Sequence, residues 1–144
     1  MDATALEPQR TKVLFVCVGN SCRSQLAEAI ARQYAPDLIE AESAGTRPLG
    51  FVALETLAVL QENGIRAEGH HSKSIDEARI LFEPKIVVNM SGRRLNGMFP
   101  DATVLDWEIE DPFGNDAETY QRIYAEIERR VKKLVIDLRK EQTA

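Results

Sequence analysis

Short continuous apolar runs alternate with longer segments of helical periodicity along the 144-residue chain. The runs "KVLFVC" (12–17) and "KIVVNM" (85–90) are typical of strands buried on both faces of a sheet. The segment "LIEAESAG" (38–45) predicts a third strand, and "ATVLDW" (102–107) predicts a short edge strand. The pattern therefore predicts about four strands.

Between and after these runs, apolar residues recur at helical spacing. A helix is expected at 23–34, where Pro36 ends it, and a second at 51–63. A short helical stretch is expected near 93–98. The longest amphipathic stripe predicts a helix at 116–139.

Strands that alternate with helices imply right-handed βαβ units. The predicted fold is α/β: a single-domain three-layer sandwich, with a central parallel sheet of about four strands flanked by helices on both sides. The domain is expected to span 11–140, between a flexible N-terminal leader (1–10) and a tail (141–144).

Composition and charge narrow the possible partners. A hydrophobic content of 44% and a charged content of 28% are ordinary for a soluble globular protein. The net charge of −5 argues against nucleic acid and anionic membranes as partners. No apolar run reaches the ~20 residues of a membrane span. The two cysteines, Cys17 and Cys22, suit neither a disulfide framework nor a zinc site, so a reducing cytoplasm is the expected location.

The segment "CVGNSCRS" (17–24) lies where a predicted strand gives way to a predicted helix. Ligands of parallel sheets bind at this edge, and the N–H groups of such a loop can converge on a tetrahedral oxyanion. Gly19 and Asn20 tolerate the left-handed backbone that a tight curl requires. Arg23 adds a planar fork for two anion oxygens.

The same positive field favours the thiolate form of Cys17, and Ser24 is placed to donate a hydrogen bond to its sulfur. This chemistry is nucleophilic attack on phosphorus, or on an analogous centre, through a covalent thio-intermediate. A cysteine that ends a buried strand is often inert core. The full string Cys17-x-Gly19-Asn20-x-x-Arg23-Ser24 favours the reactive interpretation.

This string resembles the loop of the low-molecular-weight protein tyrosine phosphatases, and of the arsenate reductases that share their fold. The resemblance covers the chain from residue 12 to about residue 138. It implies that Cys17 is the nucleophile, that Arg23 grips the phosphoryl group and that Ser24 supports the thiolate. It also implies that no metal or organic cofactor is needed.

The resemblance extends to a late loop, "DWEIEDPFGND", which supplies Asp111-Pro112. The family's aspartate at this position acts as general acid, which a phenolic leaving group requires. The rival carboxylates in this loop are Asp106, Glu108, Glu110 and Asp116. The proline beside Asp111 stiffens the loop and favours Asp111 over them.

The remaining site residues are implied by the same resemblance. Those expected to bind the phosphate or support the loop are Val18, Gly19, Asn20, Ser21, Cys22, Ser24, Ser43 and His71. His71 is preferred over His70 as an anchor of the loop. Leu49 and Phe113 match the walls of the pocket for the substrate ring, although local packing explains them equally well. Cys22 is a small filler, an inherited residue or a resolving thiol that protects Cys17 as a reversible disulfide, the hypothesis favoured here.

Two related activities remain open. The strings "NSCRSQLAEA", "SKSIDE" and "DWEIEDP" look closer to the arsenate reductase branch, and Glu28 matches a residue of the cation site in the reductases with a thiol relay. That relay uses cysteines after the strand at 85–90, where this chain has Ser91 and no later cysteine. The favoured function is therefore hydrolysis of a phosphotyrosine protein or a small phosphoester. The alternatives are arsenate reduction with an external thiol of the glutaredoxin, mycothiol or thioredoxin type and, more remotely, a non-catalytic oxyanion-binding module.

Overall fold

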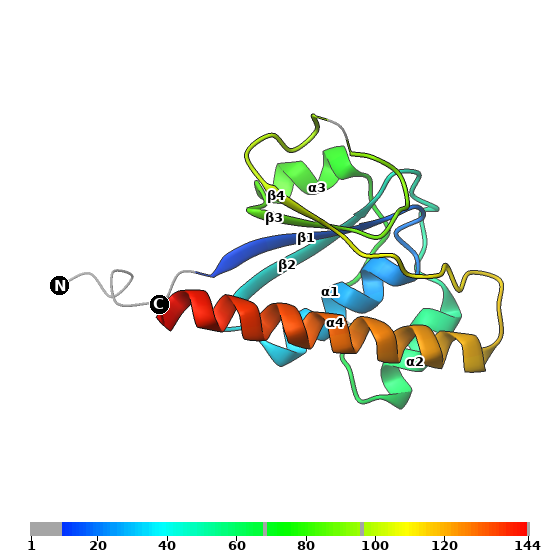
Figure 1. Cartoon of the computed structure of the whole chain (residues 1–144). Helices are drawn as coiled ribbons and strands as arrows, with labels where there is room; N and C mark the ends of the chain where they lie inside the picture. The colour runs from blue at the N-terminus through cyan, green and yellow to red at the C-terminus, as the bar shows by residue number, and fades with distance from the viewer. Residues whose placement is uncertain (1–9, 68, 96, 144) are drawn as a thin grey trace.

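The computed structural model describes residues 10–143 except 68 and 96, and it contains one four-stranded parallel sheet (Figure 1). The spatial order of the strands is β2-β1-β3-β4. Their bounds are Thr11–Cys17 for β1, Ile39–Gly45 for β2, Ile86–Asn89 for β3 and Thr103–Asp106 for β4. The helices are α1 (Arg23–Tyr34), α2 (Leu54–Glu62), α3 (Ile75–Leu81) and α4 (Ala117–Thr143).

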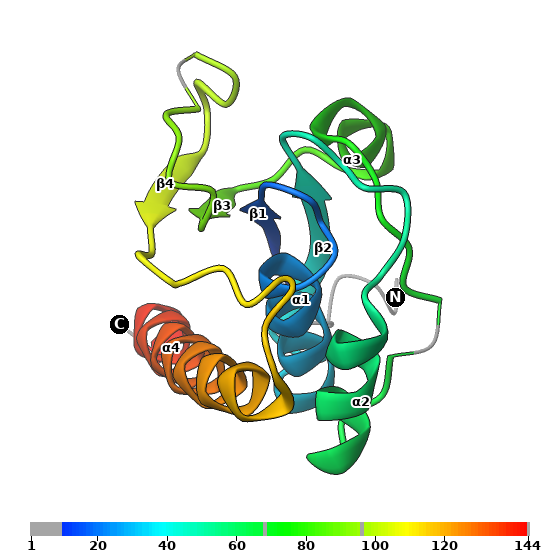
Figure 2. The ribbon, with the colours of Figure 1, turned by 90° about the vertical axis from the view of Figure 1, so that its right-hand side faces the viewer.

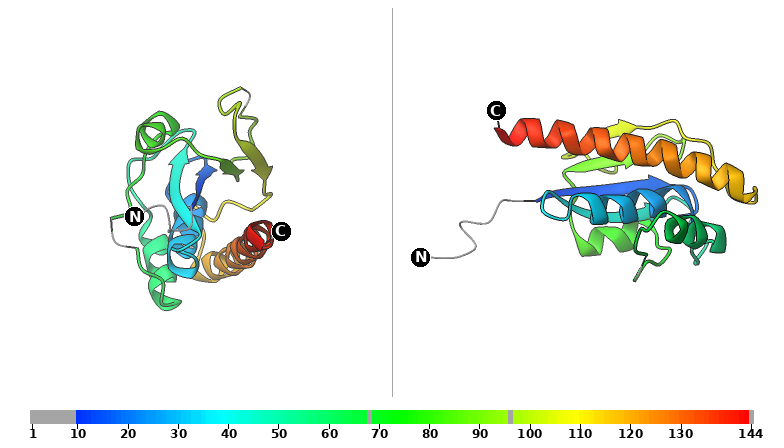
Figure 3. Two further views of the ribbon diagram at one scale, coloured as in Figure 1. Left: turned by 90° about the vertical axis from the view of Figure 1, so that its left-hand side faces the viewer. Right: turned by 90° about the horizontal axis from the view of Figure 1, so that it is seen from below.

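The helices cover both faces of the sheet, which confirms the predicted three-layer α/β fold. Helices α1, α2 and α4 lie on one face and α3 lies on the other (Figure 2 and Figure 3). Alternate residues of β1 serve the two cores. Phe15 packs in the core under α1 and α4, whereas Leu14 and Val16 pack with Ala78 and Phe82 in the core under α3. This two-sided burial explains the continuous apolar run of β1.

Several element boundaries differ from the sequence prediction. No helix was expected at α3, although Ser74 and Glu77 form a capping box at its start. The prediction of a helix near 93–98 is wrong, because the described residues there form bends, turns and irregular structure. Gly92 and Gly97 both have a positive φ, which a helix does not allow. Helix α2 begins at residue 54 instead of 51.

The predictions for the chain ends have different outcomes. Helix α4 continues to Thr143, so residues 141–143 extend this helix and do not form a separate tail. The leader falls on residues 1–9, which lie outside the described residues, and on Arg10. Among the described helices, none combines the length and the apolar character needed to cross a membrane.

Candidate active site

Loop 17–24 joins the carboxyl end of β1 to the first turn of α1 and directs its carbonyl groups outward. Several of these carbonyls accept hydrogen bonds of 2.8–3.2 Å from donors outside the loop; they belong to Cys17, Val18, Gly19 and Ser21. The N–H of a trans peptide points opposite to its C=O. The loop N–H groups are therefore directed into the curl, beside the N-terminus of α1, which is a favourable arrangement for a tetrahedral oxyanion.

Two backbone features allow the loop to close. Asn20 has a φ of 48°, in the left-handed region, as expected from its position in the turn. Gly45, at the end of β2, lies so close that a Cβ atom there would be 2.5 Å from the carbonyl oxygen of Val18. Gly19 does not adopt the left-handed backbone that the sequence suggested; its Cβ position is restricted instead by Leu49, at 3.0 Å.

The side-chain amide of Asn20 orients two hydroxyl groups beneath the loop. The backbone N–H of Lys73 donates to Oδ1 of Asn20 at 2.8 Å, so the amide nitrogen faces the other way. That nitrogen donates to Oγ of Ser24 at 2.8 Å and to Oγ of Ser43 at 2.9 Å. Oγ of Ser24 also lies 2.9 Å from Sγ of Cys17, and it donates to the sulfur whenever Cys17 is a thiolate, because a thiolate can only accept.

The same network continues from Ser43 to a buried histidine. Ser43 donates to the carboxylate of Glu28, whose Oε2 lies 3.5 Å from Nε2 of His70. Nδ1 of His70 lies 3.0 Å from Oε1 of Gln25. Because the amide nitrogen of Gln25 donates to two backbone carbonyls, its Oε1 accepts the Nδ1 proton. Burial lowers the pKa of His70 below its usual 6.5 and outweighs the attraction of Glu28.

The structure reverses the expectation for the two adjacent histidines. The side chain of His70 is 2% exposed and contacts Gln25 and Glu28. The side chain of His71 is exposed, and within the described part of the chain its ring has one hydrogen-bond partner, the carbonyl oxygen of Gly69, at 3.4 Å. His71 contributes its backbone carbonyl to Gln25, so its predicted side-chain role as an anchor of the loop is wrong.

Backbone carbonyls hold one side of the Arg23 guanidinium, whereas the other side has only Asp111 as a partner among the described residues. Nη1 donates to the carbonyl oxygens of Met90 at 2.6 Å and Ile109 at 3.0 Å, just beyond β3 and β4. Nη2 lies 3.6 Å from Oδ2 of Asp111, and Nε is buried with no partner among the described residues. Nε and Nη2 form the edge of the fork that binds two oxygens of one anion. On this edge the Nε–H is therefore available to a ligand.

A cavity of about 240 Å³ lies over the loop and collects the predicted site residues. Cys17 and Arg23 line it, together with the predicted walls Leu49 and Phe113. Asp111 also lines it, with its side chain half exposed and its Oδ1 accepting a hydrogen bond from the backbone N–H of Phe113 at 3.1 Å. A nucleophile, a two-oxygen donor and a carboxyl group therefore face one small space.

The second cysteine lines the same cavity but is held by the long C-terminal helix. Sγ of Cys22 lies 3.2 Å from the hydroxyl of Tyr120 in α4. Burial is the largest influence on Cys22 and raises its pKa, so the group is a neutral thiol at pH 7. Cys17 and Cys22 are both free thiols in this structure.

Comparison with known proteins decides the family. The family model described as low molecular weight phosphotyrosine protein phosphatase matches residues 12–144. The chain belongs to this family. An arsenate reductase of Bacillus cereus is 34% identical over 131 residues, covering 89% of this chain and 96% of that protein. A glutaredoxin arsenate reductase of Synechocystis is 31% identical over 129 residues, covering 86% and 95%.

Among solved structures, an arginine phosphatase of Geobacillus stearothermophilus superposes with a TM-score of 0.81 at 30% identity, covering 92% of this chain and 96% of the other. The family thus contains relatives named for two activities. The chain is an enzyme of the thiol-dependent phosphatase and arsenate reductase type.

Several residues that support the family's loop in this chain were not predicted from the sequence. Gln25 is fully buried and joins Asn20 to the segment that carries His70. Lys73 fixes the orientation of Asn20 through its backbone, for which no side-chain signal exists. Glu28 was noted only as a match to a cation site, although a carboxylate on the apolar face of a predicted helix is itself a signal of a buried polar network.

Proposed function

We propose that the protein is a phosphomonoester hydrolase of the low-molecular-weight tyrosine phosphatase type, acting through a cysteinyl-phosphate intermediate. One observation carries the proposal. Sγ of Cys17 lies 2.9 Å from the Ser24 hydroxyl in a cavity that Arg23 and Asp111 also line, and Nε of Arg23 is buried without a partner among the described residues. A module that only bound oxyanions would need neither the oriented sulfur nor Asp111.

In the first step, the Cys17 thiolate attacks phosphorus in line with the leaving oxygen. The S–P bond forms as the P–O bond to the leaving group breaks, and Asp111 gives its proton to the departing oxygen. Loop N–H groups and the Nε–Nη2 edge of Arg23 bind the three equatorial oxygens, whose charge is greatest in the transition state.

In the second step, water hydrolyses the cysteinyl-phosphate. Asp111, now a carboxylate, takes a proton from the water, which attacks phosphorus and releases inorganic phosphate and the Cys17 thiolate. The hydroxyl of Ser24 stabilises this leaving thiolate. The thiolate must stay reduced between turnovers, which agrees with a cytoplasmic location.

The substrate class follows from the walls of the cavity. Leu49 and Phe113 are both about half exposed, and the ring of Phe113 lies 6.5 Å from that of Phe51. These apolar surfaces suit a flat ring such as that of phosphotyrosine. A small aryl phosphoester presents the same ring and phosphoryl group.

Arsenate reduction is the second candidate, supported by the relatives named arsenate reductase and by the position of Cys22 in the same cavity as Cys17. Cys17 would displace an oxygen of arsenate to form an S–As bond. A second thiol would then attack Sγ of Cys17, forming a disulfide and releasing arsenite with the electron pair. The sequence has no cysteine after Cys22, and position 91 is a buried serine that donates to Oδ1 of Asn89 at 2.6 Å. An external thiol must therefore return the enzyme to its reduced form.

A side-by-side assay of one reduced sample tests the proposal. The wild type is expected to hydrolyse p-nitrophenyl phosphate, and Cys17→Ser to abolish turnover. The same sample is then given arsenate and NADPH with glutaredoxin or with thioredoxin and their reductases. NADPH oxidation that depends on arsenate and on Cys17, without phosphatase activity, would replace the proposed function with the second candidate.

A further inference from the structure

Two segments from distant parts of the chain meet beside the cavity over the loop, here called the catalytic cavity. Leu49, after β2, and Phe113, after β4, both line this cavity. The ring of Phe113 also contacts the ring of Phe51, with 6.5 Å between their centroids and a tilt of 52°. This separation lies within the ~4.5–7 Å range of favourable aromatic pairs. Phe51 is not among the residues that line the catalytic cavity, so it meets Phe113 outside the space that the substrate enters.

Hydrogen bonds on both sides of Phe51 tie its segment to the loop that follows β1. Before Phe51, the N–H of Leu49 donates to the carbonyl oxygen of Gly19 at 2.9 Å. After Phe51, the N–H of Ala53 donates to the carbonyl oxygen of Ser21 at 3.2 Å. Phe51 therefore keeps its place relative to the loop that binds the phosphoryl group.

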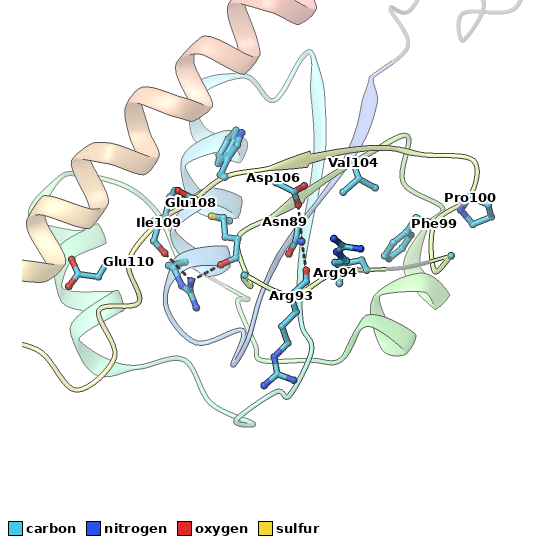
Figure 4. Close-up of a pocket in the computed structure, with 16 residues that line it drawn as sticks. Asn89, Arg93, Arg94, Phe99, Pro100, Val104, Asp106, Glu108, Ile109 and Glu110 are labelled. Atoms are coloured by element: carbon cyan, nitrogen blue, oxygen red, sulfur yellow. Dashed lines mark hydrogen bonds between the residues drawn. The ribbon is translucent and has the colours of Figure 1, made fainter.

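Contacts of the surrounding chain set the direction of the Asp111 carboxyl group. The side chains of Asp111 and Phe113 are both about half exposed. The backbone N–H of Phe113 donates to Oδ1 of Asp111 at 3.1 Å, so the position of residue 113 directs this carboxyl group. Upstream, Nη1 of Arg23 donates to the carbonyl oxygen of Ile109 at 3.0 Å (Figure 4). Arg23 thus holds the chain before Asp111, and the ring of Phe51 supports the chain after it.

We infer that Phe51 is a positioning residue for proton transfer: its ring supports Phe113, whose N–H directs the carboxyl group of Asp111 in the catalytic cavity. The inference rests on the proposed function, in which Asp111 protonates the leaving oxygen, and adds to that step a residue outside the cavity. A proton donor must lie about 2.6–3.2 Å from the atom it protonates. A displacement of about 1 Å is enough to slow such a step strongly. Because Phe51 is tied to the phosphoryl-binding loop, it keeps the donor aligned with the bound phosphoryl group.

Two aryl phosphates with different leaving groups test the inference. Phenyl phosphate needs its leaving oxygen protonated, whereas p-nitrophenyl phosphate depends much less on protonation. Phe51→Ala should lower kcat/KM for phenyl phosphate about 5–10-fold, as expected for the loss of one aromatic pair, and should lower it less than about 2-fold for p-nitrophenyl phosphate. Phe51→Tyr keeps the ring and should retain the wild-type values.

Leu54→Ala is the matched control. Leu54 is apolar, 77% exposed and three positions from Phe51, and it does not line the catalytic cavity. This variant should keep the wild-type ratio of the two kcat/KM values. Urea unfolding checks that Phe51→Ala is folded in the assay. If it is not, Phe51→Leu, which keeps apolar bulk without a ring, replaces it and should lower the same ratio.

Combination with Asp111→Asn separates positioning from a direct role. If Phe51 acts through Asp111 alone, Phe51→Ala should have no further effect on phenyl phosphate turnover in Asp111→Asn. A residue that contacts the substrate, or that only stabilises the fold, would lower kcat/KM for both substrates and in both backgrounds. Equal losses for the two substrates, or the same loss with Asp111 and without it, would overturn the inference while the proposed function stands. A wild type that hydrolyses neither substrate would contradict the proposed function, and the inference with it.

Discussion

The backbone N–H of Lys73 donates a 2.8 Å hydrogen bond to Oδ1 of Asn20 and thereby fixes which end of this amide faces the nucleophile. The amide nitrogen then donates to Ser24 and Ser43, and it holds the Ser24 hydroxyl 2.9 Å from Sγ of Cys17. A residue 53 positions away in the sequence thus orients the amide that holds a hydroxyl group beside the sulfur.

Asn20→Gly and Asn20→Ala separate the role of the amide from that of the backbone. Both remove the donor to two buried hydroxyls, so we expect a loss of about 1–3 kcal/mol in the free energy of unfolding. The kcat for p-nitrophenyl phosphate should fall about 10²-fold, as for a misplaced catalytic group. Asn20→Ala should cost about a further 1–2 kcal/mol, because only glycine accepts the φ of 48° without strain. Urea unfolding and steady-state kinetics measure both effects; equal stability of the two variants would contradict the backbone argument.

The lowered pKa of His70 predicts a pH dependence of stability. The unfolded chain takes up a proton near pH 6.5, whereas the buried ring resists protonation until a lower pH. The unfolded state therefore binds more protons in this window, and the free energy of unfolding falls as the pH drops below about 6.5. His70→Gln should make that fall shallower, with Glu28, Arg32 and Lys73 unchanged around the site.

His71→Gln is the matched control, because the neighbouring ring is exposed. Urea unfolding at several pH values between about 5 and 7.5 gives the slopes for both variants and the wild type. We expect the His71 variant to retain the wild-type slope. If the two variants have the same slope, the buried ring is not the titrating group.

The variant Asp111→Asn tests whether Asp111 is the proton donor, through the dependence of kcat/KM on the leaving group of the substrate. The loss of kcat/KM should reach about 10²–10⁴-fold for phenolic esters with poor leaving groups and be much smaller for p-nitrophenyl phosphate. A linear free-energy plot against the pKa of the leaving phenol should become steeper. Glu110→Gln changes the adjacent carboxylate, which is paired with Arg122, and should keep the wild-type slope. An unchanged slope in Asp111→Asn would remove this residue from the acid role.

Cys22 and Tyr120 predict a reversible response to peroxide. Hydrogen peroxide oxidises the Cys17 thiolate to a sulfenic acid, which the Cys22 thiol converts to a disulfide with loss of water. Wild-type activity should return with dithiothreitol, whereas Cys22→Ser should recover much less because Cys17 oxidises further. Tyr120→Phe removes the hydroxyl that holds Cys22 at 3.2 Å and should speed disulfide formation, measured by mass spectrometry of alkylated peptides. Equal recovery of wild type and Cys22→Ser would contradict the protective role.

Local patterns in the sequence were sufficient for the strands and for the loop residues. The two-sided burial of β1 makes its apolar run continuous, and the string at 17–24 is contiguous, so Cys17, Arg23 and Ser24 are readable as one unit. The capping box of α3 was also present, as Ser74 followed three residues later by Glu77, but the seven-residue helix it starts is too short for a clear periodicity.

Contacts between distant segments were not readable. The two histidines are adjacent in the sequence, and only one of their side chains points into the protein. His70 is the buried one because it contacts Gln25 and Glu28, and no local sequence pattern predicts those contacts. The helix expected near 93–98 was favoured by spacing alone. In the structure, Asn89 binds the carbonyl oxygen of Arg93 and holds the segment in a turn, so a side-chain contact overrides the periodicity.

The covalent intermediate is the most direct test of the account. Asp111→Asn is mixed with p-nitrophenyl phosphate, whose leaving group needs little protonation, and is quenched with acid within the first turnover. Because water activation is impaired, the phosphorylated enzyme should accumulate. Peptide mass spectrometry is expected to find one phosphoryl group on Cys17. Release of p-nitrophenol in the first turnover with an unmodified Cys17, or with the phosphoryl group on another residue, would contradict the proposed mechanism.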